Sequence, residues 1–314
     1  MTRFLVNADT FARAETDRMF AAVLADSGGV NLLSHTRTPT PLDHQPVIRM
    51  NRDTLYSAAV VDISGGAVLT LPDAGGRYLS AMVVNRDHYV NAVLHDPGQH
   101  ELTTERFDTD YVAVAVRILV DPADPEDVAV VNALQDGVSL TAAAARPFTT
   151  PDYDAESLDR TRSALLQLAK GYAGFDGAFG SREEVDPVRH LVGTAAGWGG
   201  LPAHEATYVN VDPGLPVGEY RLTVRDVPVD GFWSVSLYTA DGYFDDDGSR
   251  VSLNNLTAQK DPDGSVTVHF GGCADGRPNC LGIKEGWNYL VRLYRPRPEV
   301  LDGTWTVPEV SPVR

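Results

Sequence analysis

Arginine and tyrosine side chains stand close together in the segment M-N-R-D-T-L-Y, where they could bind a small polar molecule. Arg52 and Tyr56 are four residues apart, so on an extended strand their side chains point to the same face. A guanidinium and a phenol on one face can hold a carboxylate or a carbonyl oxygen. The alternative for Arg52 is a buried ion pair with a carboxylate that locks two sheets together.

The second candidate is His88 in N-R-D-H-Y, a histidine with acidic and aromatic neighbours. Histidine is well suited to general acid–base catalysis near neutral pH. Asp87 could orient the His88 ring only if this segment is a turn, because neighbours on a strand point to opposite faces. His190, on a predicted helix, is more simply explained as a histidine satisfied by its partners.

Two segments with strict alternation, residues 232–238 and 287–294, predict strands that each have one polar face. The polar faces carry Ser234, Ser236, Tyr238, Asn288, Arg292 and Tyr294. The opposite faces, which include Trp233 and Trp287, predict a hydrophobic core. If the strands are neighbours, their polar faces form one wall of the kind that lines small-molecule sites. The alternative is a wall that packs against the other domain or faces water.

No motif predicts a metal or an organic cofactor. His95 and His100 flank the turn D-P-G-Q, but two histidines supply at most half of a metal site. The loop D-D-D-G at residues 245–248 lacks the alternating acids and the closing Glu of a calcium loop, so a solvated turn is expected. The sequence has no G-x-S-x-G, G-x-x-x-x-G-K-[ST] or H-E-x-x-H, and no G-x-G-x-x-G after a strand.

The chain of 314 residues has 26 basic and 43 acidic residues, which gives a net charge of −17. This balance argues against a nucleic-acid-binding or anionic-membrane surface, since both favour clustered Lys and Arg. No run of 18 apolar residues predicts a membrane span. The start, M-T-R-F-L-V-N-A-D-T, has no long apolar segment, so no signal peptide is predicted and a cytoplasmic location is expected.

The two cysteines, Cys273 and Cys280, enclose the turn-rich loop C-A-D-G-R-P-N-C. In a reducing cytoplasm two free thiols are expected, and a disulfide that closes the loop is the alternative. A zinc site is not predicted, because two further ligands are missing.

Strand patterns on both sides of a helical block predict a mainly β fold with two domains. Strands are predicted before the block at residues 48–50, 55–63, 67–71, 78–84, 89–94 and 111–119. Helices are predicted at residues 7–25, 125–136, 155–170 and 187–196. Later strands are predicted at residues 208–211, 220–224, 232–238, 251–253, 265–270, 287–294 and 304–307. The boundary is expected near residue 150, which gives domains 1–150 and 151–314.

Several segments resemble two paired families of bacterial proteins of unknown function. M-N-R-D-T-L-Y-S, G-G-R-Y-L-S and V-R-I-L-V-D-P-A-D-P-E-D with A-L-Q-D resemble the family DUF1254. V-D-G-F-W-S-V-S-L-Y, D-G-S-V-T-V, N-C-L and V-R-L-Y-R-P followed by G-T-W resemble its usual companion, DUF1214. The resemblance runs from about Phe11 to Pro308. It implies two β-sandwich domains joined by helices, the second jelly-roll-like, and no particular reaction. Many relatives carry an export signal that this sequence does not show.

Two functions from different classes remain. In the first, the chain binds or processes a small anionic or carbonyl-containing molecule in a cleft at the domain junction, without a cofactor. The residues expected there are Arg52, Tyr56, Tyr238, Arg292 and Tyr294 as ligand-binding residues and His88 as the catalytic candidate. In the second, the jelly-roll-like domains are structural and mediate assembly into a homo-oligomer. Clustered cations and phenols favour the first, because the net charge of −17 repels anions from most of the surface.

Overall fold

The structure, a computed structural model, describes residues 3–313 and divides into two compact units. The first, called the N-terminal unit, contains the chain up to Arg37 together with Tyr56–Ile118 and Ala129–Ala203. The second, called the C-terminal unit, contains Thr38–Leu55, Leu119–Val128 and the chain from His204 onward. Because the chain passes repeatedly from one unit to the other, these units do not coincide with the predicted boundary near residue 150.

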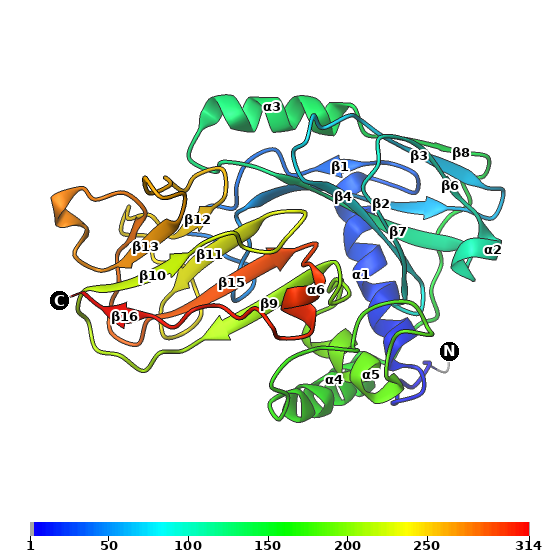
Figure 1. The fold of residues 1–314 in the computed structure, drawn as a ribbon. Coiled ribbons are helices and arrows are strands. Elements are labelled where there is room, and N and C mark those ends of the chain that lie inside the picture. The colour runs from blue at the N-terminus through cyan, green and yellow to red at the C-terminus, as the bar shows by residue number, and fades with distance from the viewer. Residues whose placement is uncertain (1–2, 314) are drawn as a thin grey trace. The chain divides into compact units, whose positions relative to one another are not determined.

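The N-terminal unit contains two sheets (Figure 1). The five-stranded sheet has the spatial order β1 (Ser34–His35), β2 (Thr54–Asp62), β7 (Tyr111–Leu119), β4 (Leu79–Asn85) and β5 (Val90–Leu94). The three-stranded sheet has the order β6 (Gly98–Leu102), β3 (Ala67–Leu71) and β8 (Ser139–Ala142). Strand β4 is buried along its whole length and is antiparallel to both neighbours, which fits its run of apolar residues.

The four predicted helices form, together with one short helix, α2, that was not predicted. They are α1 (Phe11–Ser27), α2 (Thr104–Phe107), α3 (Pro125–Asp136), α4 (Ala155–Ala169) and α5 (Pro187–Ala196). Helix α1 ends at Gly28, whose φ of 84° is a left-handed conformation that glycine adopts without steric cost. Asp154 and Asp186 cap α4 and α5, because their carboxylates accept hydrogen bonds from backbone N–H groups of the first turn.

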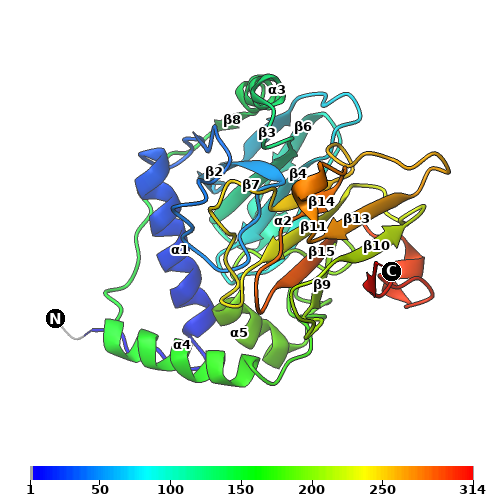
Figure 2. The ribbon, with the colours of Figure 1, turned by 90° about the vertical axis from the view of Figure 1, so that its left-hand side faces the viewer.

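Helix α1 connects helices α4 and α5 to the five-stranded sheet of the N-terminal unit. Near the start of α1, Phe11 packs in one cluster with Leu158 of α4 and Val192 of α5. Figure 2 shows α4 beside this end of α1. Farther along, Phe20 packs against Tyr111 of β7 and its sheet neighbours. The buried residues of α1 therefore hold the helices against the sheet.

The C-terminal unit is a sandwich of two four-stranded sheets. One sheet has the order β14 (Cys280–Leu281), β13 (Val266–Phe270), β10 (Tyr220–Val224) and β16 (Ser311–Pro312). The other has the order β12 (Ser252–Asn254), β11 (Trp233–Tyr238), β15 (Asn288–Tyr294) and β9 (Ala206–Val211). Leu222 and Val268 of the first sheet share one core with Val235 and Val291 of the second. A short 3-10 turn (Cys273–Asp275) and helix α6 (Pro298–Leu301) complete the unit. The mainly β fold with helices is thus confirmed.

Strands β11 and β15 are adjacent and antiparallel, with Ser234 opposite Arg292 and Tyr238 opposite Asn288. Their apolar faces lie in the core as predicted, and Trp233 and Trp287 are 9% and 2% exposed. Their polar faces are buried too, since every residue of both strands is buried. The polar faces therefore do not face water, and they are packed inside the protein.

A few predicted elements are wrong. Residues 48–50 form a turn, and residues 304–307 form an irregular segment. The helical spacing in residues 155–170 predicts that Leu158, Leu165 and Leu168 face inward; Leu158 and Leu165 are buried, but Leu168 is 59% exposed. Strands β1, β6, β8, β14 and β16 and helices α2 and α6 were not predicted, because each is short and its residues show no clear alternation or helical period of apolar side chains.

The two cysteines form a disulfide, Cys273–Cys280, so the expectation of free thiols is wrong. The loop between them contains a 3-10 turn and brings the two residues together. No helix within residues 3–313 is both long and apolar enough to cross a membrane.

Candidate anion-binding site

Arg292 is the centre of a buried polar cluster in the C-terminal unit. Its Nη1 donates to Ser236 Oγ at 2.7 Å, and its Nη2 donates to Tyr238 Oη at 2.8 Å. Nη2 also donates to the carbonyl oxygens of Arg49 and Met50, at 2.9 and 3.1 Å. The Arg292 side chain is 3% exposed. Its donors are therefore used within the unit, and we assign Arg292 to the core.

Asp53 is the carboxylate nearest to this guanidinium. Its Oδ2 lies 3.9 Å from Arg292 Nη1, and its side chain is fully buried. Asn254 Nδ2 donates to its other oxygen at 3.3 Å. Burial raises the pKa of Asp53 above the ordinary carboxyl value, and the charge of Arg292 opposes this shift. Arg292 therefore lies in a buried pair with a carboxylate, whereas the ion pair considered for Arg52 is not observed among the described residues.

Arg52, in contrast, lies at a cavity of about 290 Å³ within the C-terminal unit. Its Nη1 donates to the carbonyl oxygen of Thr40 at 2.6 Å. Among the described residues no carboxylate forms an ion pair with it. Burial lowers the pKa of Arg52 below the ordinary arginine value, while the nearby charge of Asp53 acts in the opposite direction. Arg52 thus has hydrogen-bond donors left for a ligand.

A second arginine, Arg250, lines the same cavity just before strand β12. The described residues supply no carboxylate partner for it. Ser249 and Ser252 add hydroxyl groups to the wall, and Val251 adds an apolar surface. Asp121 also lines the cavity, but its Oδ1 already accepts a hydrogen bond from the backbone N–H of residue 123. Two arginines with hydroxyl groups and an apolar wall form a site suited to a small carboxylate or phosphate.

The predicted tyrosines have separate surroundings. Tyr238 Oη donates to the carbonyl oxygen of Met50 at 2.8 Å, within the Arg292 cluster. Tyr294 is stacked on Phe232 with ring centroids 4.2 Å apart, and its hydroxyl accepts a hydrogen bond from Asn51. Tyr56 belongs to the N-terminal unit, where the Arg117 guanidinium lies 5.6 Å from its ring centroid.

His88, the catalytic candidate, is fully buried in the N-terminal unit. The backbone N–H of Gly199 donates to Nε2 at 2.9 Å, so Nε2 is unprotonated. Nδ1 therefore carries the proton and donates to Thr194 Oγ1 at 2.8 Å, whose own proton goes to the carbonyl oxygen of His190. Trp198 and His190 stack against the imidazole. Both ring nitrogens are used inside the protein, which is the arrangement of a structural histidine.

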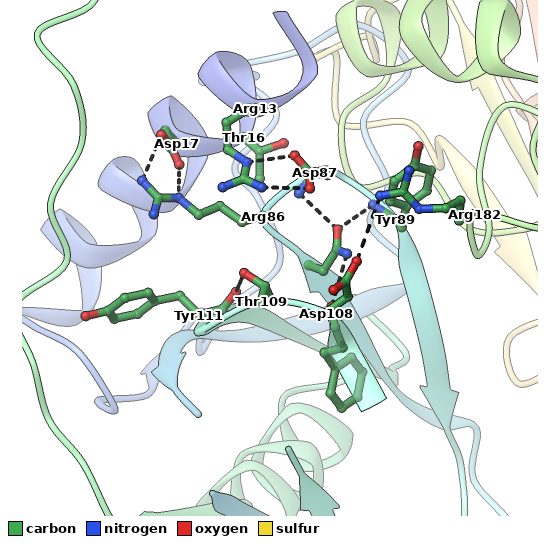
Figure 3. A network of polar contacts seen from close by, with 12 residues as sticks. Arg13, Thr16, Asp17, Arg86, Asp87, Tyr89, Asp108, Thr109, Tyr111 and Arg182 are labelled. Carbon is green, nitrogen blue, oxygen red and sulfur yellow. Dashed lines mark hydrogen bonds and ion pairs between the residues drawn. The ribbon is translucent and has the colours of Figure 1, made fainter. Parts of the chain in front are cut away.

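The turn that carries His88 is fixed by reciprocal ion pairs with α1 (Figure 3). Arg13 forms two hydrogen bonds of 2.7 Å with Asp87. Arg86 forms two with Asp17, at 2.5 and 3.0 Å. Bidentate pairs of this kind fix orientation as well as distance. The segment is a turn, the condition under which Asp87 could orient His88, yet Asp87 pairs with Arg13 instead.

We predict that His88 makes the protein less stable in acid. Burial, reinforced by the charge of His190, lowers the pKa of His88 to about 3, whereas an unfolded histidine titrates near 6.5. Below pH 6.5 the unfolded chain binds a proton that folded His88 does not, so stability falls as the pH falls. The loss between pH 7 and pH 5 is about 2 kcal/mol from this group. Urea unfolding at several pH values measures it.

The matched variant is His88→Gln, compared with the wild type by the pH slope of its unfolding free energy. Between pH 5 and 6 the unfolding free energy of the wild type should depend more steeply on pH than that of the variant, by the uptake of about one proton on unfolding. Between pH 7.5 and 8.5 the two curves should run parallel. Equal slopes at pH 5 to 6 would show that His88 is protonated in the folded state.

The remaining candidates do not form a metal site. His95 Nδ1 forms a hydrogen bond with the carbonyl oxygen of Leu79, and His100 Nε2 forms one with the carbonyl oxygen of Asp96. In the acidic loop at residues 245–248, two of the three aspartates pair with Lys284. Within residues 3–313 no group of three or more His, Cys, Asp or Glu side chains is arranged to hold a metal ion.

Arg250 is the residue that reasoning from the sequence missed. It precedes V-S-L, a strand too short to show on which side its neighbours lie, and it is 198 positions from Arg52. A weak signal was present, because Arg250 is a single cation after the acidic run D-D-D-G-S.

Comparisons with solved structures confirm the fold. A crystal structure of the VPA0106 protein from Vibrio parahaemolyticus matches with a TM-score of 0.74 and 19% identity, over 98% of each chain. A crystal structure of an uncharacterised protein from Burkholderia cenocepacia matches with a TM-score of 0.54 and 15% identity, over 97% of this chain and 88% of the other. At these identities the likeness concerns the fold alone. No curated protein matches the chain.

Family models match two separate segments. Residues 30–101 match DUF1254, a protein family of unknown function, and residues 215–298 match DUF1214, another family of unknown function. Both segments occur in this order in one chain, as the sequence motifs indicated. The resemblance of this chain to the paired DUF1254 and DUF1214 families is therefore confirmed.

Proposed function

We propose that the protein binds a small anionic molecule in the cavity lined by Arg52 and Arg250. The observation that carries the proposal is that both arginines line one cavity and neither pairs with a carboxylate of the described residues. In a chain with a net charge of −17, two arginines that line one cavity without a carboxylate partner form a local region that favours anions. The site lies within the C-terminal unit, whereas the sequence led us to expect it at the domain junction.

The size and chemistry of the cavity favour a small carboxylate. A volume of about 290 Å³ is at the lower end of the range for small-molecule sites, about 300–1,000 Å³. Guanidinium groups bind carboxylates through two parallel hydrogen bonds, and two arginines can hold a molecule with two anionic groups. Val251 and Leu42 offer apolar contact to a short carbon chain. His88 has no part in this site, so we propose ligand binding and assign no reaction.

Succinate and its neutral diamide, succinamide, provide a direct test. They have nearly the same shape but differ by two negative charges. We expect wild-type protein to bind succinate at least tenfold more tightly than succinamide in calorimetric titration at low ionic strength. A charged hydrogen bond contributes about 1.5–3 kcal/mol, so Arg52→Ala and Arg250→Ala should each weaken succinate binding at least tenfold.

The matched control is Arg297→Ala, which removes an exposed arginine paired with Asp230 outside the cavity. It should bind succinate like the wild type. If succinate binds no better than succinamide, or if both cavity variants retain wild-type affinity, the proposal is wrong. Light scattering on the same samples tests the alternative of assembly into a homo-oligomer, which stays a prediction.

A further inference from the structure

A second cavity, of about 560 Å³, opens at one edge of the C-terminal sandwich. Strand β9 is the edge strand of one sheet, and β16 is the edge strand of the other. After α6, residues 302–310, here called the strap, lead to β16. Figure 1 shows the strap in red between α6 and β16. The strap and β9 both line the cavity, which we call the strap cavity.

The strap cavity is continuous with the core of the sandwich. Val209 and Val211 of β9 are paired with Val291 and Tyr289 of β15, so their side chains share the core-facing side of the sheet. Unlike the central strands, β9 leaves Val209 and Val211 only partly buried. Trp305 of the strap packs against the same core and is also partly buried. Together they present an apolar surface that the protein itself does not fully cover.

The strap is held at its ends more than along its middle. At one end, the backbone N–H of Trp305 donates to the carbonyl oxygen of Glu299 at 2.7 Å. At the other end, Ser311 and Pro312 pair with β10. Residues 306–310 have no backbone hydrogen bond to other described residues. This middle part forms the cavity wall through side-chain packing and can shift without breaking a sheet.

The polar groups of the strap cavity favour a cation over an anion. Glu309 is the charged residue in its lining, and its side chain is exposed at the opening. The buried Tyr289 phenol lies in the same wall, and its pKa is raised to about 12 by burial and by the charge of Glu309. The carboxylate is thus close enough to act on the cavity. The net charge of −17 adds a field that attracts cations.

We propose that the strap cavity is a second ligand site, which takes a small amphiphile with an apolar chain and a cationic head group. The chain lies between Val209, Val211 and Trp305, and the head group lies at the opening beside Glu309. The volume falls within the usual range for small-molecule sites. The proposal is independent of the anion site, which has the opposite charge preference and a different lining.

Three eight-carbon probes separate the contributions of chain and head group: octylammonium, octanol and octanoate, titrated calorimetrically at pH 7.5. We expect octylammonium to bind most tightly and octanoate at least tenfold more weakly. Glu309→Gln should weaken octylammonium about fivefold, the range for an exposed ion pair, and leave octanol unchanged. Hexylammonium should bind about tenfold more weakly than octylammonium, because two buried methylene groups are lost.

Filling the cavity provides the test of location. Val209→Phe on the edge strand and Thr306→Trp on the strap should each abolish binding of all three probes. Val217→Phe is the control, since Val217 is 58% exposed and lies outside the lining. Urea unfolding shows whether each variant is folded. If Val209→Phe does not fold, Thr306→Trp still tests the location of the site. Equal binding of octylammonium and octanoate would overturn the charge preference, and wild-type binding by a folded filled variant would overturn the site.

Discussion

Arg292→Ala should destabilise the protein by about 3–5 kcal/mol, the cost of removing one partner from a buried ion pair. The variant would leave Asp53 fully buried without its nearest cation. It would also remove the arginine donor from Ser236, from Tyr238 and from the carbonyl oxygen of Arg49, whereas the carbonyl oxygen of Met50 keeps the hydrogen bond from Tyr238. Each unsatisfied buried group adds to the cost. Urea unfolding of the wild type and the variant at pH 7 measures the difference.

The control for this prediction is another arginine–aspartate pair in the same unit. Arg297 Nε lies 2.7 Å from Asp230 Oδ1, closer than the 3.9 Å between Arg292 and Asp53, yet both side chains are about half exposed. Water screens this pair, so Arg297→Ala should leave the free energy of unfolding nearly unchanged. If the two variants have similar stability, the burial of Arg292 is not what makes it important, and our assignment of this residue to the core fails.

The sequence predicts elements best where a local signal sets both their type and their ends. Asp186-Pro187 caps α5, and its predicted start is confirmed. The alternation in residues 220–224 predicts β10 with the observed bounds. Residues 304–307 lack such a signal. The apolar and β-branched residues of G-T-W-T-V-P fit a strand, but they fit an irregular segment that packs on a core equally well. The structure shows that packing against the sandwich, and not pairing in a sheet, explains those apolar residues.

The candidate site was harder to predict, because it depends on which distant segments meet. Alternation places Ser236 and Arg292 each on the polar face of its own strand, but it does not show whether those faces meet water or another segment. Residues 49–53 cover this face, and nothing local in the sequence signals it. Arg52 was identified as a ligand-binding candidate on its residue type. Its partner at the cavity, Arg250, comes from a part of the chain with no motif.

The disulfide Cys273–Cys280 was within reach of the local sequence. The loop C-A-D-G-R-P-N-C could close on itself, and the structure shows that it does. The expectation of free thiols follows from the predicted reducing compartment, whereas the local turn favours the disulfide. Local geometry was the better guide. The cytoplasmic location on which that expectation depended stays a prediction.

The second large effect is expected at the centre of the C-terminal sandwich. Trp287→Ala and Trp233→Ala should each cost about 3–5 kcal/mol, the range for truncating a large buried aromatic side chain. Trp287 is the more deeply buried of the two, and its ring centroid lies 5.1 Å from that of Phe270 on the opposite sheet. Its indole N–H donates to the carbonyl oxygen of Leu215 at 3.1 Å. Truncation would therefore leave a cavity between the sheets and an acceptor without its donor.

Trp287→Phe separates these two contributions. It keeps most of the ring volume but removes the indole N–H, so it should cost less than the alanine variant, by an amount that reflects the cavity. Trp305→Ala is the matched control, because Trp305 packs on the same core from the partly exposed strap and should cost much less. Chemical denaturation followed by circular dichroism measures all four variants. If Trp287→Ala unfolds at the same denaturant concentration as the wild type, the central packing of the sandwich does not depend on this residue.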